Sequence, residues 1–198
     1  LLKHIENVTE QFGLPAVVAI NKFPTDTEAE IELVEKRCNE QGVNAAMTDV
    51  WGQGGKGGVD LAREVLKLTE EKNNSFDYIY DSALPIVDKI EAIARAVYGA
   101  DGVEFTPAAR REIGRLEQNG LGNLPVCMAK TQYSLSDDPK KLGRPEGFKI
   151  VVRGVKVSAG AGFIVALTGD VMTMPGLSKT PSAQNIDVDN RGRISGLF

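Results

Sequence analysis

The segment 15–51 most constrains how this chain can fold, because its pattern is a strand, a helix and a second strand. An unbroken apolar run over 16–20 is followed by an amphipathic helical pattern that ends at Gly42, and a second apolar run covers 43–50. A helix between two such runs is typical of a βαβ unit with parallel strands. The chain is therefore expected to be an α/β protein with an open, mostly parallel sheet and flanking helices, of the P-loop NTPase-like or Rossmann-like kind.

The remainder of the chain predicts further helices and then a change to short strands. Residues 1–12 repeat at helical spacing before Gly13, and later helices are expected over 59–72, 85–97 and 107–120, with a strand over 124–130. From residue 148 onward, β-branched runs follow one another closely, which favours hairpins, and a last strand is expected near 186–188. We expect an α/β ligand-binding domain portion over 1–135 and a smaller, β-rich α+β part over 136–198.

Two helices carry more detailed expectations. Thr25, with Glu28 three residues later, predicts a capping box at the start of the first helix of the βαβ unit. In the helix 59–72, Leu61, Val65 and Leu68 recur at helical spacing and are expected to face inward.

Composition and charge exclude several classes of protein. A net charge of -4 gives no basic footprint for nucleic acid, and no apolar run approaches the roughly 20 residues that cross a bilayer. Neither a membrane partner nor a signal peptide is expected. Cys38 and Cys127 lie far apart in apolar patterns, which argues against a zinc site or a disulfide framework and for a reducing compartment, so a cytoplasmic location is expected.

Phe23 and Trp51 follow the ends of the two strands of the βαβ unit and are the most informative pair of side chains. The carboxyl ends of parallel strands meet at one edge of a sheet, where α/β proteins bind ligands. Two aromatic rings there could hold a planar ligand such as a pterin or a purine, with roughly 0.5–1.5 kcal/mol of stacking per aromatic pair. The alternative is that both rings pack in the core.

A glycine-rich loop over 52–58 carries one cation, Lys56. Its backbone amides could cradle an anion, or the segment could be a flexible connection. The spacing is not that of the phosphate loop GxxxxGK[ST], because Gly57 follows Lys56.

Asn21 and Lys22 suggest an alternative function. They resemble the start of NKxD, the base-reading motif of P-loop GTPases, which would make the chain part of a nucleotide-binding switch module. However, Pro24 occupies the fourth position and Asp26 comes two residues late.

Other candidates for chemistry are few. The chain's one histidine, His4, lies in a helical pattern, so a histidine-dependent triad would need a partner from outside this segment, and no cluster has metal-ligand spacing. Lys130 closes the strand 124–130 just as Lys22 closes the first. It could contribute to the same cleft, or its ammonium could simply extend to solvent at a strand end.

Five blocks of sequence, in order along the chain, resemble the C-terminal portion of formate-tetrahydrofolate ligase, also called 10-formyltetrahydrofolate synthetase. These blocks are AINKFPTDT at 19–27, WGQGG at 51–55, CMAKTQYS at 127–134, VSAGAGF at 157–163 and MTMPGL at 172–177. The resemblance implies an ATP-dependent ligase that joins formate to tetrahydrofolate through formyl phosphate, giving 10-formyltetrahydrofolate, ADP and phosphate.

The resemblance also implies site residues. In the family, the pterin ring lies between a Phe and a Trp that match Phe23 and Trp51, and Pro24 lines the same pocket. Further possible contributors to the cleft are Asn21, Lys22, Met47, Gly54, Gly55, Lys130, Met174, Pro175 and Leu177.

Cofactors and partners are implied by the same resemblance. They are ATP, Mg²⁺, a monovalent cation (K⁺ or NH₄⁺) and a homo-oligomer, typically a cytoplasmic tetramer. The chain begins within a helical pattern and without Met, which suggests a longer protein with an N-terminal phosphate-loop domain. Most catalytic residues would lie there, and this segment alone would bind folate without turnover.

Overall fold

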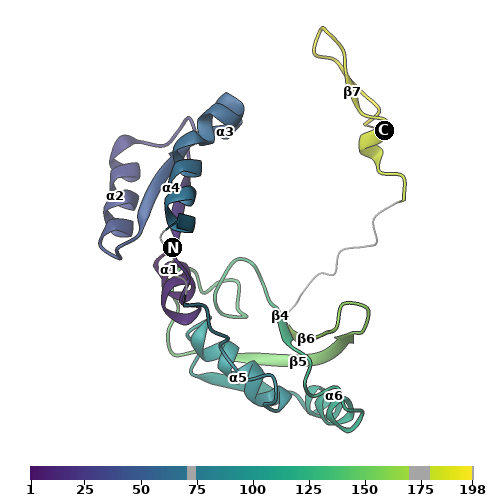
Figure 1. Ribbon diagram of the computed structural model, residues 1–198. Coiled ribbons are helices and arrows are strands. Elements are labelled where there is room, and N and C mark those ends of the chain that lie inside the picture. The colour runs from purple at the N-terminus through teal and green to yellow at the C-terminus, as the bar shows by residue number, and fades with distance from the viewer. Residues whose placement is uncertain (71–74, 170–178, 198) are drawn as a thin grey trace.

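The computed structural model describes residues 1–70, 75–169 and 179–197. Figure 1 shows an N-terminal α/β unit and a second sheet, which meet near the first helix of the chain. The helices are α1 (Leu2–Glu6), the π-helical turn η1 (Asn7–Gln11), α2 (Glu28–Asn39), α3 (Val50–Gln53), the 3₁₀ turn η2 (Gly54–Gly58), α4 (Val59–Glu70), α5 (Ile86–Ala96), α6 (Pro107–Gln118) and the 3₁₀ turn η3 (Ser182–Gln184). The strands are β1 (Val17–Asn21), β2 (Asn44–Thr48), β3 (Gly102–Phe105), β4 (Val126–Ala129), β5 (Lys149–Ser158), β6 (Phe163–Thr168), β7 (Asp187–Val188) and β8 (Ile194–Ser195).

The expected βαβ unit is present, with β1 and β2 parallel and α2 between them in sequence. The register runs from Val17 opposite Asn44 to Asn21 opposite Thr48, so both strands end at the same edge. Cys38 of α2 is buried in a cluster with Ile5, which joins α1 to the unit. Although the run 16–20 is apolar, the residues of β1 are half-buried or exposed, and in the described chain β1 pairs with β2 alone.

The capping box of α2 lies two residues later than the sequence suggested. Thr27, rather than Thr25, accepts a hydrogen bond from the backbone N–H of Glu30 (3.3 Å), and the Glu30 carboxylate accepts one from the N–H of Thr27 (3.0 Å). The reason is a turn before the helix, in which the N–H of Asp26 donates to the carbonyl of Phe23 (3.0 Å). That turn uses residues 23–26, so the helix can begin only after it.

The apolar side of α4 is less covered than expected. The helix packs along β2 and β1, but among its described residues none is buried, and Val65 is exposed. Leu61 and Leu68 are half-buried, so the inward face predicted for them is only partly formed.

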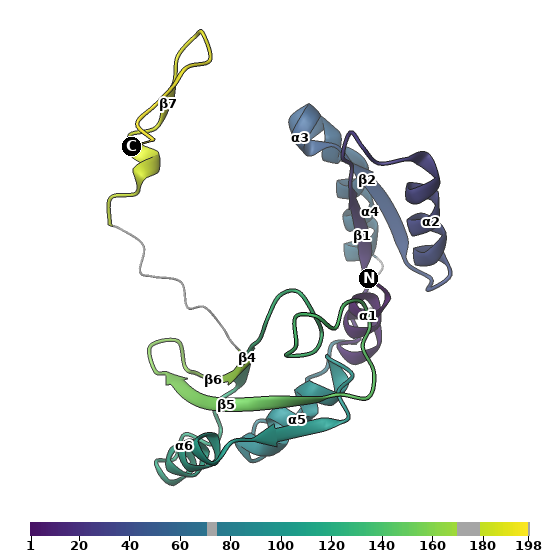
Figure 2. The same cartoon turned by 180° about the vertical axis from the view of Figure 1, so that it is seen from behind.

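The second sheet has the strand order β3-β5-β6-β4 and contains the main core. β3 pairs parallel with β5, and β4 pairs parallel with β6, while β5 and β6 form an antiparallel hairpin. Figure 2 shows α5 and α6 on one side of the long strand β5. Buried side chains from both helices pack there against the sheet, among them Ile86, Ile90, Ile113, Val152 and Ile164.

These strands confirm the mixed α/β class, with a mostly parallel sheet, flanking helices and small separate sheets. The hairpin expected after residue 148 is present, whereas β3 was missed because its four residues include Gly102 and Glu104. The boundary expected after residue 135 separates strands of one sheet, since β3 and β4 precede it and β5 and β6 follow it.

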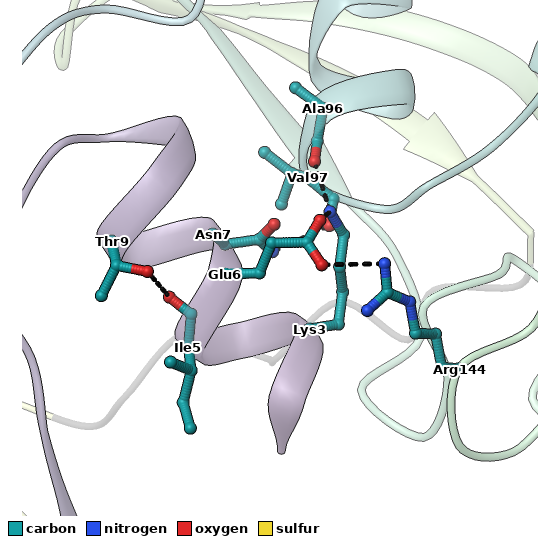
Figure 3. A network of polar contacts seen from close by, with 8 residues as sticks. All are labelled: Lys3, Ile5, Glu6, Asn7, Thr9, Ala96, Val97 and Arg144. Atoms are coloured by element: carbon teal, nitrogen blue, oxygen red, sulfur yellow. Dashed lines mark hydrogen bonds and ion pairs between the residues drawn. The ribbon is translucent and has the colours of Figure 1, made fainter. Parts of the chain in front are cut away.

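A polar contact joins the first helix of the chain to α5 (Figure 3). The ammonium of Lys3 donates to the carbonyl of Ala96 (2.9 Å), and the amide of Asn7 donates to the carbonyl of Val97 (2.8 Å). The last carbonyls of a helix have no partner within the helix. The two buried side chains therefore satisfy the end of α5 and fix the N-terminal unit against the second sheet.

Replacing Thr27 with Ala should lower the free energy of unfolding by about 1 kcal/mol, because α2 loses its N-cap. Chemical denaturation measures the change. Thr25→Ala is the matched control and should have almost no effect; equal losses in both variants would contradict the observed cap.

Glu6 should make this contact sensitive to acid. Its carboxylate contacts the ammonium of Lys3 and lies 2.8 Å from the guanidinium of Arg144. The hydrogen bond from Lys3 lowers the pKa of Glu6 below its usual value, and Arg144 adds to this. A depressed pKa contributes stability above the ordinary pKa and loses it as pH falls through the folded-state value.

We therefore expect Glu6→Gln to be less stable than wild type at neutral pH, with the difference disappearing in acid. Urea unfolding across the acid range measures this. A difference that stayed constant with pH would show that the carboxylate charge contributes nothing.

Candidate ligand-binding site

A pocket of about 500 Å³ lies at the carboxyl ends of β1 and β2. Its lining residues are the last residue of each strand and the residues that follow it: Asn21, Lys22, Phe23, Pro24, Thr48, Asp49, Val50 and Trp51. Of the side chains predicted for a site, the structure thus brings Asn21, Lys22, Phe23, Pro24 and Trp51 together. Parallel pairing makes this possible, because both strands deliver their following residues to one edge.

Hydrogen bonds between the two strands hold the floor of this pocket. The N–H of Lys22 donates to the carbonyl of Thr48 (3.0 Å), which extends the parallel ladder by one step. The buried hydroxyl of Thr48 lies 3.0 Å from Oδ1 of Asn21 and 3.2 Å from the carbonyl of Ile20. The strand ends are therefore tied to each other rather than left loose beside the pocket.

Phe23 is held away from the core by the turn that follows β1. Its N–H donates to Oδ2 of Asp26 (2.8 Å), and its side chain is 63% exposed. Asp26 is thus a turn residue, with its carboxylate on the backbone beside the phenyl ring. That role differs from the base-reading carboxylate of the GTPase motif, so the geometry gives no support to the switch-module alternative.

Trp51 is presented by a short helix. Asp49 caps α3, since its Oδ1 accepts from the N–H of Gly52 (3.2 Å) and its Oδ2 accepts from the side-chain amide of Gln53 (2.8 Å). The indole lies in the first turn of α3 and is 88% exposed. It therefore does not pack in the core, which was the alternative for this residue.

The glycine-rich segment was expected to be a loop. It instead forms the end of α3, followed by the 3₁₀ turn η2. The N–H of Asp49 donates to the carbonyl of Gly57 (3.0 Å), which closes the segment on itself. A Cβ at Gly57 would lie 2.2 Å from the carbonyl oxygen of Asp49, so glycine is required for this closure. The segment after Trp51 therefore has helical structure and is closed by this hydrogen bond.

Both rings are available to a ligand. In the described part of the chain, neither Phe23 nor Trp51 stacks on another aromatic ring; the stacked and edge-on rings are Phe12, Phe76 and Tyr78, outside this pocket. Two exposed rings lining one pocket can hold a planar, conjugated ligand between them. Lys22 adds a cation to the lining.

The remaining candidates lie elsewhere. Met47 lines a separate hollow between β2 and α4, and Gly54 and Gly55 lie in η2, outside the residues that line the pocket. Lys130 follows β4 in the other sheet. Met174, Pro175 and Leu177 lie outside the described residues.

Sequence reasoning missed Thr48, Asp49 and Val50 as lining residues. A signal was present for Asp49, because an Asp directly before an apolar residue and Trp is a suitable N-cap. The run of glycines after it obscured that signal.

Among the described residues, no group of three His, Cys, Asp or Glu side chains could hold a metal ion. A search of the same residues finds no helix that is long and apolar enough to cross a membrane.

Fold and pocket together define a mixed α/β protein with two exposed aromatic rings in one pocket at the carboxyl edge of parallel strands. The family model for formate–tetrahydrofolate ligase matches residues 1–198, and the chain therefore belongs to the formate–tetrahydrofolate ligase family. This family consists of ligases of one-carbon metabolism that use formate, tetrahydrofolate and ATP.

Gly57→Ala should destabilise the support of Trp51 by about 1–3 kcal/mol, because the added methyl group overlaps the Asp49 carbonyl. Thermal unfolding and the near-ultraviolet circular dichroism of Trp51, the chain's one tryptophan, report the change. Gly55→Ala is the matched control, since a Cβ there meets nothing within 4 Å. Unchanged stability and spectrum in Gly57→Ala would contradict the rigid closure.

Proposed function

We propose that this chain supplies the tetrahydrofolate site of a formate-tetrahydrofolate ligase, with the pterin ring of the substrate between Phe23 and Trp51. The observation that carries the proposal is that these two exposed rings line one pocket at the strand ends. Pro24 lines the same pocket and limits the position of the ring edge. The family match supports tetrahydrofolate as the planar ligand.

The reaction we propose has two steps. Formate attacks the γ-phosphorus of ATP, which forms formyl phosphate and releases ADP. N10 of tetrahydrofolate then attacks the formyl carbon, inorganic phosphate leaves, and 10-formyltetrahydrofolate forms after N10 loses its proton. Ring stacking places N10 for the second step, since orientation of two reactants supplies much of the catalysis in such transfers.

We propose that the groups that bind the phosphates of ATP lie in parts of the enzyme outside these described residues. Mg²⁺ and the monovalent cation, K⁺ or NH₄⁺, bind in those parts as well. Lys22 remains available near the pterin pocket for an anionic group of a substrate.

We further propose that the enzyme is a cytoplasmic homotetramer that contains an N-terminal phosphate-loop domain. Exposed apolar side chains on α4, such as Val65 and Leu66, support burial against another part of the assembly.

Phe23→Ala and Trp51→Ala, made in the complete enzyme, should each raise the KM for tetrahydrofolate on the order of 10-fold, from lost stacking and lost apolar contact. The KM for ATP should be nearly unchanged. Steady-state kinetics measures both constants, and Tyr78→Ala, an exposed aromatic outside the pocket, is the control. An unchanged folate KM in both pocket variants would contradict the proposed site.

Titration with tetrahydrofolate or a stable folate analogue should quench the fluorescence of Trp51 in a saturable way. Phe23→Ala should weaken the binding curve, because the second ring of the sandwich is lost. Equal quenching in Phe23→Ala and wild type would place the ligand on Trp51 alone.

A further inference from the structure

The ammonium of Lys130 is enclosed by the turn that follows it. It donates to the carbonyls of Thr131 (2.8 Å), Ser134 and Ser136 (2.9 Å). A lysine ammonium has three N–H donors and no acceptor. All three donors are therefore used by backbone carbonyls of one short segment.

An aromatic face completes this enclosure. The ammonium lies 5.3 Å from the centroid of the Tyr98 ring, within the range of a cation–π contact. Burial lowers the pKa of Lys130, and the nearby charge of Asp137 opposes that effect. The side chain occupies a built site for a small cation, rather than reaching into solvent.

The turn so formed is anchored to the second sheet. Ser136 is buried, and Asp137 accepts a hydrogen bond from the N–H of Val151 in β5 (2.9 Å). The carbonyl of Asp137 packs against Gly169, where an added Cβ would lie 2.9 Å away and φ is +59°. Lys130 thus connects the end of β4 to the end of β6 through the turn 131–137.

The position of this turn matters because β4 and β6 are parallel and end at the same edge. The hydroxyl of Thr168 donates to the carbonyl of Ala129 (3.1 Å), which ties these two ends together. The carboxyl edge of parallel strands is where α/β proteins place ligands. Tyr133 lies in this turn and is 67% exposed.

We propose that Lys130 is a positioning residue of the ligase, an internal cation that folds the turn 131–137 over the carboxyl edge of β4 and β6. Its ammonium does not contact a substrate, because it has no free donor. The effect of Lys130 on catalysis rests on the proposed ligase function. Its effect on the conformation of the turn 131–137 does not depend on that function.

The test is chemical rescue in the complete enzyme. Lys130→Ala removes the cation and leaves the carbonyl enclosure, which ammonium or methylammonium ions can enter. We expect kcat to fall about 10- to 100-fold, as for a misplaced element at a site, with small changes in the KM values. Added ammonium should restore much of the loss, and tetramethylammonium, which has no N–H donor, should not.

Limited trypsin digestion provides a readout that does not depend on activity. Cleavage after Lys140 and Lys141, just beyond the turn, should accelerate in Lys130→Ala and slow again with ammonium. Lys156→Ala, which removes an exposed lysine of β5, is the matched control, and every rescue is expressed relative to wild type in the same salt. Should Lys130→Ala fail to fold, Lys130→Met keeps the side-chain length without donors and should show the faster cleavage without rescue.

Two outcomes would overturn the proposal. A large rise in the KM for ATP with unchanged cleavage of the turn would make Lys130 a substrate contact. Unchanged kcat with faster cleavage would limit Lys130 to stability. Quenching of Trp51 by folate should be the same in Lys130→Ala and wild type. The quenching experiment therefore tests the proposed folate site independently of the role of Lys130.

Discussion

The parallel pairing of β1 with β2 is the constraint on which the candidate site depends. Because the register places Asn21 opposite Thr48, the chain leaves both strands at one edge, and the residues that follow must share the same space. The Lys22 to Thr48 hydrogen bond and the Asp49 cap then fix where Phe23 and Trp51 stand. The two rings are 28 positions apart in the sequence, and this pairing brings them to the same pocket.

Long polar side chains satisfy backbone carbonyls at several ends of elements. Lys3 donates at the end of α5 and Lys130 at the end of β4. Lys89, fully buried in α5, donates to the carbonyls of Gly122 (2.6 Å) and Leu124 (3.1 Å), and burial lowers its pKa. An unpaired buried carbonyl is costly, so each lysine fixes a connection that carries no regular hydrogen bonding.

Family and geometry contribute different parts of the functional argument. The family match covers 1–198 and establishes the class of enzyme. The pocket is the observation behind the proposed tetrahydrofolate site, since two exposed rings that line one pocket suit a flat, conjugated substrate.

Local signals were read correctly where a single preference acted on the chain. The apolar run before Phe23 marked the end of β1, and the helix expected from residue 107 begins there, whereas β2 ends at Thr48, two residues earlier than expected. Expectations were wrong where two preferences competed. Thr25 does not cap α2, because residues 23–26 form a turn before the helix, and Asp49 caps the short helix α3 where a glycine loop was expected. Short β3 carried too weak a pattern to stand out.

The sequence by itself determined the βαβ unit, the α/β class and the pair of aromatic residues at the strand ends, because periodicity and turn residues act over a few positions. Tertiary structure alone decided which donors and acceptors meet across the chain. It placed the ammonium of Lys89 against the carbonyls of Gly122 and Leu124, and it assigned β3 and β4 to one sheet with β5 and β6. The physical reason is that hydrogen bonds between distant segments depend on packing, which no local pattern encodes.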